Sequence, residues 1–190
     1  MKSYLLLLLL ILLVLLNGCA APVIVAGAAG GAIAVSDERK PASIVDDQLI
    51  EVKVKDKLYT DALLGDKIHI NVTSYNGVVL LTGETLSTAL RNRAIEVART
   101  QEKVRRIHNE IRVADLSSFG SRTQDTWITS KVKTQMLTTK DFDAAKVKVV
   151  TEFGTVYLMG LVTPDTGNQA AEIARHVSGV KRVVKLFEYI

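Results

Sequence analysis

Gly77-Val78-Val79-Leu80-Leu81-Thr82-Gly83 decides the fold of this chain, because its pattern returns as Gly154-Thr155-Val156-Tyr157-Leu158-Met159-Gly160. Both stretches follow Gly-x-Val-x-Leu-x-Gly. Glycines on either side of strand-forming residues predict a β-strand that enters and leaves through turns. A strand of this length cannot form a domain by itself, so its repetition indicates that a larger unit occurs twice.

The repeat extends on both sides of this strand. Upstream, residues 47–55 align with residues 125–133, and downstream, residues 96–99 align with residues 172–175. The spacing between the copies changes by only a residue or two along the chain. We therefore predict two domains, at residues 46–113 and 125–190, joined by a linker at residues 114–124.

The elements of each domain follow from the hydrophobic pattern. Ile50, Val54 and Leu58 predict a helix from residue 46 to about residue 60, and Asp46-Asp47 are interpreted as its caps. Alternating residues then predict a strand over 68–72, which turns through Asn76-Gly77 into the signature strand. Further elements complete the two domains, at 87–101, 104–113, 125–138, 147–151, 156–160, 165–177 and 180–189. The predicted fold class is α+β, with two tandem αββαβ domains, each a three-stranded mixed sheet with two helices on one face.

The N-terminal residues have a different composition. Lys2 precedes an unbroken apolar run from Leu5 to Leu16. A helix of this length spans about 18 Å, whereas the hydrocarbon core of a bilayer is about 30 Å thick. We therefore predict a signal peptide at residues 1–18. Residues 19–45 are rich in Ala and Gly and then polar, which predicts a flexible tether.

Cys19 ends a stretch, Leu16-Asn17-Gly18-Cys19, that resembles the lipobox of bacterial lipoproteins. The resemblance implies that Cys19 is lipidated and becomes the mature N-terminus. Ala20 is not the aspartate that retains such proteins in the inner membrane, so the resemblance also implies the periplasmic face of the outer membrane. Two alternatives stay open, namely an ordinary signal peptide cut near Ala20-Ala21 and an uncleaved anchor that includes residues 22–35.

Composition and residue spacing argue against nucleic-acid binding and catalysis. The formal net charge is only +4, and the basic residues are scattered. Cys19 is the only cysteine, which excludes an intramolecular disulfide and a thiolate cluster. His69, His108 and His176 have no partner at a metal-ligand spacing, so we expect ordinary histidines. Neither a metal nor a cofactor is expected.

Several motifs carry a resemblance to a known family. They are the two glycine-bracketed hairpins, Asp125-Thr126-Trp127-Ile128-Thr129, and Val-Ser-Gly-Val-Lys-Arg-Val at residues 177–183. The two domains resemble BON domains. The whole chain resembles the dual BON-domain lipoproteins of the Gram-negative outer membrane, the division- and outer-membrane-stress-associated lipid-binding type. The resemblance implies binding of anionic phospholipid, support of envelope integrity, association with division sites, and no catalysis.

The first helix of the second domain carries the candidate binding face. With Ile128, Val132 and Met136 facing the core, the opposite side holds the chain's only tryptophan and no acid. Trp suits a membrane interface, and Lys is attracted to an anionic surface. We therefore expect this face to bind an anionic phospholipid membrane through Trp127, Ser130, Lys131, Lys133, Thr134, Leu137 and Thr138.

The first domain lacks the same chemistry, and two alternative roles for the Trp127 face stay open. In the first domain Asp56 takes the place of Thr134 and no Trp is present, so we expect weaker lipid binding there. One alternative is that Trp127 packs beneath the linker at 114–124. Another is that the same face binds an envelope or division protein, with lipid contact incidental.

The signature strands also predict contact between the domains. On each strand the residues that point away from the helices are too apolar for a surface facing water. We expect the two outer faces to pack on each other in a monomer, and a homodimer through the same faces is the alternative. The residues concerned are Tyr75, Val78, Leu80, Tyr157 and Met159.

Overall fold

The computed structural model of the protein describes residues 40–190, and both domains lie within one compact unit. The predicted signal peptide, the predicted lipidation site Cys19 and most of the predicted tether lie outside the described residues. Among the described residues, no helix is long and apolar enough to cross a membrane.

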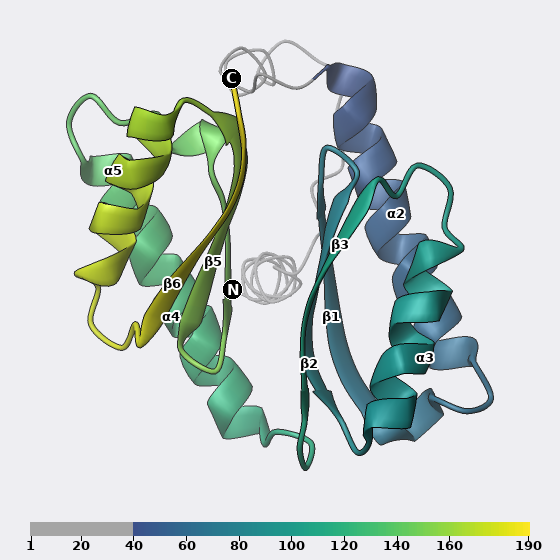
Figure 1. Cartoon of the computed structure of the whole chain (residues 1–190). Helices are drawn as coiled ribbons and strands as arrows, with labels where there is room; N and C mark the ends of the chain where they lie inside the picture. Colours follow the sequence, from purple (N-terminus) through teal and green to yellow (C-terminus); the bar gives the residue numbers. More distant parts are fainter. Residues whose placement is uncertain (1–39) are drawn as a thin grey trace, which may run out of the picture. The chain divides into compact units, whose positions relative to one another are not determined.

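The first domain is built from α2 (Pro41–Thr60), β1 (Ile68–Tyr75), β2 (Val78–Thr85), α3 (Thr88–Arg99) and β3 (Arg106–Val113), with the short 3-10 helix η1 (Gly65–Lys67) before β1. The second domain repeats this order with α4 (Phe119–Thr138), η2 (Ala144–Lys146), β4 (Lys148–Glu152), β5 (Thr155–Val162), α5 (Pro164–Arg175) and β6 (Arg182–Tyr189). The αββαβ order predicted for each domain is confirmed (Figure 1).

Each sheet is three-stranded and mixed, as predicted. The glycine-bracketed strand lies in the centre, antiparallel to the strand before it and parallel to the last strand of its domain. The two hairpins turn through Asn76-Gly77 and Phe153-Gly154, and all four residues have positive φ. Positive φ at both central residues is the type I′ geometry that matches the twist of the flanking strands.

Alternation along the central strands gives each sheet two apolar faces. In β2, Val79 and Leu81 point to the core under α2 and α3, and in β5, Val156 and Leu158 point to the core under α4 and α5. The residues between them point to the opposite face. Figure 1 shows both helices of each domain on one side of its sheet.

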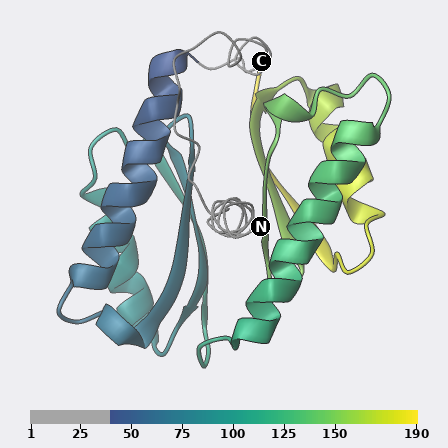
Figure 2. The ribbon, with the colours of Figure 1, turned by 180° about the vertical axis from the view of Figure 1, so that it is seen from behind.

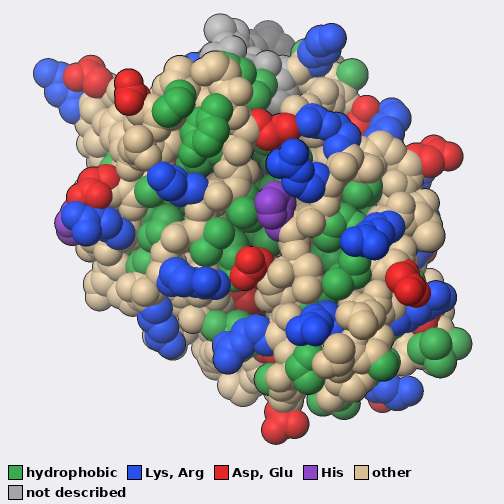
Figure 3. All heavy atoms as spheres, viewed as in Figure 1, with side chains coloured by type: hydrophobic (Ala, Val, Ile, Leu, Met, Phe, Trp, Pro, Cys, Tyr) green, Lys and Arg blue, Asp and Glu red, His purple; other side chains and the backbone are tan. Residues whose placement is uncertain are grey.

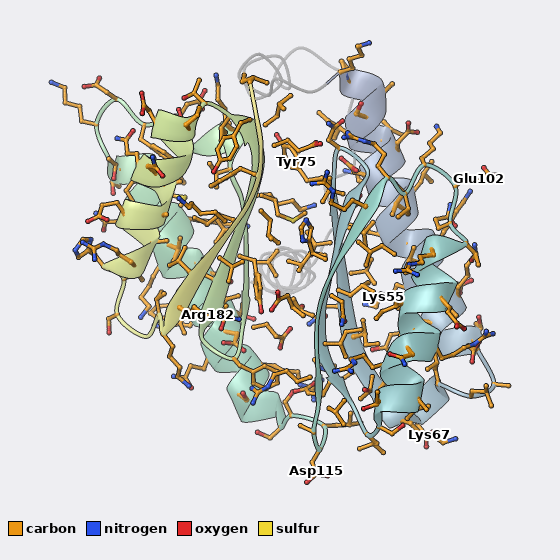
Figure 4. All side chains as sticks on the ribbon, viewed as in Figure 1. Lys55, Lys67, Tyr75, Glu102, Asp115 and Arg182 are labelled. Carbon is orange, nitrogen blue, oxygen red and sulfur yellow. The ribbon has the colours of Figure 1, made fainter. Side chains whose placement is uncertain are left out.

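The outer faces of the two sheets meet in a third buried cluster. Its fully buried members are at most 4% exposed, and Val150, Leu161, Val184 and Leu186 pack around them. Tyr75 lies between the two sheets (Figure 4). The cluster contains all five residues for which contact between the domains is predicted: Tyr75, Val78, Leu80, Tyr157 and Met159.

Polar contacts surround this apolar cluster and join the two domains. Glu188 accepts from Arg105 and Asn76, at 2.5 Å and 2.8 Å respectively. Lys148 pairs with Glu51 at 2.6 Å. These pairs lie at or near the surface, so each one adds little free energy, whereas the apolar cluster supplies most of the stabilisation.

Both first helices begin earlier than predicted. α2 starts at Pro41 and α4 at Phe119, so the last residues of the predicted tether and of the predicted linker are helical. Asp47 is therefore not a cap, because it lies inside α2 and is 2% exposed. Its carboxylate accepts from the Asn76 and Gly77 amides at 2.6 and 2.8 Å, and Asp125 does the same for the second hairpin. The capping interpretation of Asp46-Asp47 is wrong, because α2 begins at Pro41 and Asp47 holds the hairpin turn instead.

Candidate lipid-binding face

Helix α4 presents an exposed apolar face. Ile128, Val132 and Met136 are buried in the core of the second domain, while the Trp127 side chain is 65% exposed and Leu137 is 73% exposed. Trp127 does not pack beneath the preceding linker. Trp127, Ser130, Thr134 and Leu137 follow one another at i, i+3, i+7 and i+10, which places them in one stripe along the helix. Figure 2 shows α4 running along the outside of the second domain.

Three polar side chains of this face are directed back to the helix or to a neighbouring loop. Ser130 Oγ donates to the Thr126 carbonyl at 3.0 Å, and Thr138 Oγ1 donates to the Thr134 carbonyl at 3.0 Å. Lys131 Nζ donates to the Ser178 carbonyl, just after the end of α5. The hydroxyls of Ser130 and Thr138 are therefore satisfied without water, which lowers the cost of moving them into a less polar medium.

Lys131 is held at a close approach between α4 and the loop after α5. Gly179 in this loop has φ +98°, and an added Cβ would lie 3.1 Å from the Ile128 side chain. The backbone conformation therefore favours glycine here, and any larger residue would also crowd the Ile128 side chain. Lys133, by contrast, lies on the exposed flank of α4.

A groove of 770 Å³ separates the stripe from α5. α5 contributes Glu172, Ile173 and His176, and the loop that follows contributes Val177 and Ser178. Arg175 bonds Glu172 at 2.5 Å and holds the pKa of this carboxyl below its usual value. Sequence reasoning missed this acid, since Glu172 is 42 positions from Ser130 (172 − 130) and only the packing of α5 on α4 brings it there.

The corresponding region of the first domain has different chemistry. Val45, Leu49 and Val52 are exposed on α2, but Asp56 lies in the same stripe before Tyr59. The pocket between α2 and α3 is smaller, at 340 Å³, and an ion pair of Arg93 with Asp61 at 2.9 Å crosses it. The two domains share a fold, but only α4 has an apolar stripe free of acids.

Charge is mixed elsewhere on the surface. In the view of Figure 3, lysines and arginines are spread over both domains, with acidic side chains among them. No single sign of charge covers the side of the molecule seen in this view.

The chain is similar to several known proteins. The BON domain model matches residues 46–115 and again residues 124–190. "Outer membrane lipoprotein DolP" of Haemophilus influenzae is 37% identical over 84% of this chain and 82% of its own length. "21 kDa hemolysin" of Actinobacillus pleuropneumoniae is 38% identical over 81% of this chain and 79% of its own. "Osmotically-inducible protein Y" of Escherichia coli is 32% identical over 78% and 75% respectively. The chain therefore belongs to the BON-domain family, with one BON domain in each half of its repeat.

Proposed function

We propose that this protein is a non-catalytic lipoprotein of the outer membrane whose second BON domain binds anionic phospholipid through α4. The anchor would be Cys19, and the folded domains would lie at the periplasmic face. Support for the location comes from the leader sequence and from the similarity to a protein named as an outer membrane lipoprotein. Support of envelope integrity, including at division sites, belongs to the same proposal.

One observation carries the lipid-binding proposal, namely that α4 exposes Trp127 and Leu137 on a stripe without acids. A leucine that becomes fully buried contributes about 1.5 to 3 kcal/mol, and Trp is favoured where an apolar medium meets water. Lys131 and Lys133 each add about 1 kcal/mol near an anionic surface. The sum gives weak binding, which is sufficient for a domain that a lipid anchor already confines to the membrane.

Vesicle flotation tests the proposal with two matched substitutions. The protein is used as a form that starts at residue 20, which removes the anchor and keeps every described core residue. Leu137→Glu places a charge on the α4 stripe, and Val52→Glu places the same charge on α2 at a side chain that is 67% exposed. We expect the parent to float with anionic vesicles but not with zwitterionic ones.

The two variants distinguish the contributions of the two domains to lipid binding. We expect Leu137→Glu to weaken flotation by at least about tenfold, which corresponds to about 1.4 kcal/mol, and Val52→Glu to change it by less than about threefold. Circular dichroism must show that both variants remain folded. Absence of flotation for the parent would favour the protein-interaction module. Equal losses of flotation in both variants would show that α4 does not contribute more to lipid binding than α2.

A further inference from the structure

Three metal-ligating side chains from both domains converge at the sheet interface. His69 on β1 and Glu84 on β2 are directly opposite each other in the antiparallel pair, and Glu152 ends β4. One ligand atom from each lies within 4.8 Å of the other two. His69 Nδ1 is 2.9 Å from Glu84 Oε2. Their separation along the chain hid this group from sequence reasoning, which expected no metal site.

Apart from the contact of His69 with Glu84, the two carboxylates of this group are buried without a basic partner. Glu84 is 0% exposed and Glu152 is 5% exposed. Among the ion pairs of the described residues, neither carboxylate has a lysine or an arginine. Arg112, the register partner of Glu84 on β3, lies instead over the Phe153 ring. Buried negative charge of this kind requires a compensating cation or a bound proton.

Hydrogen bonds orient each carboxylate through one oxygen. Glu152 Oε2 accepts from Asn71 Nδ2 at 2.9 Å and from Thr82 Oγ1 at 3.0 Å, so groups of the first domain hold an acid of the second. Glu84 Oε1 accepts from the Ser117 amide at 3.2 Å, while Glu84 Oε2 points toward His69. Such second contacts are typical of carboxylates that bind metal ions.

Two further features fit a bound ion. The Ser117 hydroxyl is buried and makes no hydrogen bond, although its own amide holds Glu84. A pocket of 260 Å³ is lined by Glu152, Phe153 and Arg112, so it reaches one of the three side chains. An entry path is one requirement of a site that exchanges its ion.

We propose that His69, Glu84 and Glu152 bind one divalent transition-metal ion, with Zn²⁺ as the best match, and that this ion joins the two BON domains. One imidazole with two carboxylates is a donor set for Zn²⁺, whereas Mg²⁺ and Ca²⁺ take mainly oxygen ligands. Tetrahedral ligands at about 2.0 to 2.1 Å from zinc are about 3.3 Å apart, so small side-chain rotations complete the site. Water supplies the fourth ligand.

Metal analysis and calorimetry on the full chain in detergent test this proposal. The protein is treated with EDTA, dialysed, and titrated with Zn²⁺ and separately with Mg²⁺. We expect one Zn²⁺ per chain and no Mg²⁺. At a free Zn²⁺ concentration about 100 times Kd, we expect Tm to rise by about 5 to 10 °C. Co²⁺ should give the visible absorption of a tetrahedral site.

Matched histidine variants assign the site. His69→Gln should lose the bound ion and the Co²⁺ absorption, whereas His176→Gln, at an exposed histidine 3.8 Å from Glu172, should keep both. Glu152→Asp retains the charge but withdraws the carboxylate, so it should weaken Zn²⁺ binding by about tenfold or more. This second variant tests the site independently in case His69→Gln misfolds. Stoichiometry near zero in the parent, or equal binding in the parent, His69→Gln and Glu152→Asp, would overturn the proposal.

Discussion

Single residues fix the close approach of strands in this fold. Gly83, the last residue of the first Gly-x-Val-x-Leu-x-Gly stretch, has φ +110°, and an added Cβ would lie 2.0 Å from the His69 carbonyl oxygen. Gly65 also has positive φ, at +43°, but no atom lies within 4 Å of its Cβ position. The two glycines therefore separate the cost of backbone conformation from the cost of a steric clash.

We expect Gly83→Ala to destabilise the protein far more than Gly65→Ala. The control should cost about 1 to 2 kcal/mol for its left-handed conformation. Gly83→Ala adds a clash with backbone that cannot move without breaking the β1–β2 pair, so we expect a loss of at least about 4 kcal/mol. Thermal unfolding followed by circular dichroism measures both. Similar melting temperatures for the two variants would contradict this account.

At the scale of elements, a buried aspartate joins each first helix to the hairpin of its domain. Asp47 accepts hydrogen bonds from the Ser74 hydroxyl and from two turn amides, and Asp125 accepts from two turn amides. Because a carboxylate is acceptor-only, one side chain satisfies several buried donors at once. The repeated contact explains why the two aspartates occupy the same position in both repeats.

We expect Asp47→Ala to lower the free energy of unfolding by about 2 to 4 kcal/mol, because it leaves buried amides without an acceptor. Asp46→Ala is the matched control. Asp46 pairs with Lys103 at 2.6 Å on the surface, so its loss should cost less than about 1 kcal/mol. Urea unfolding of both variants gives the comparison. A smaller loss for Asp47→Ala than for Asp46→Ala would refute the turn contact.

The local sequence pattern made the helices and strands predictable, whereas the contacts between distant side chains depend on tertiary packing. The repeat, Asn76-Gly77 and the alternation in β2 and β5 indicated the strands, the turns and the apolar outer faces. The helix starts were misplaced because Asp47 looks like a cap in sequence and is a buried acceptor in space. Glu172 beside α4 and Glu152 beside His69 come from distant segments, and no local signal places them there.

At the scale of the whole molecule, the two sheets pack face to face around a mixed apolar and polar interface. Tyr157 belongs to the buried cluster, and its hydroxyl donates to Glu110 of the first domain at 3.2 Å. Burial, together with the Glu110 carboxylate, raises the pKa of Tyr157 to about 12. The folded state thus favours the neutral phenol.

We expect an alkaline loss of stability that Tyr157 controls. Since the pKa of Tyr157 is higher in the folded state, its contribution is complete below about pH 10 and is lost as the pH rises to about 12, by at most about 2 to 3 kcal/mol. Tyr157→Phe should cost about 1 kcal/mol at pH 7 but show a flatter decline between pH 10 and 12. Parallel curves of unfolding free energy against pH for the parent and the variant would argue against this role.

The proposed lipid binding requires that α4 of the second BON domain enters an anionic membrane surface. Trp127 is the only tryptophan and is 65% exposed, so its fluorescence reports on this face alone. The most direct measurement is its emission during titration of the form that starts at residue 20 with anionic and then zwitterionic vesicles. We predict a blue shift with anionic vesicles alone, which weakens at high salt. An unchanged emission at saturating anionic lipid would contradict the claim.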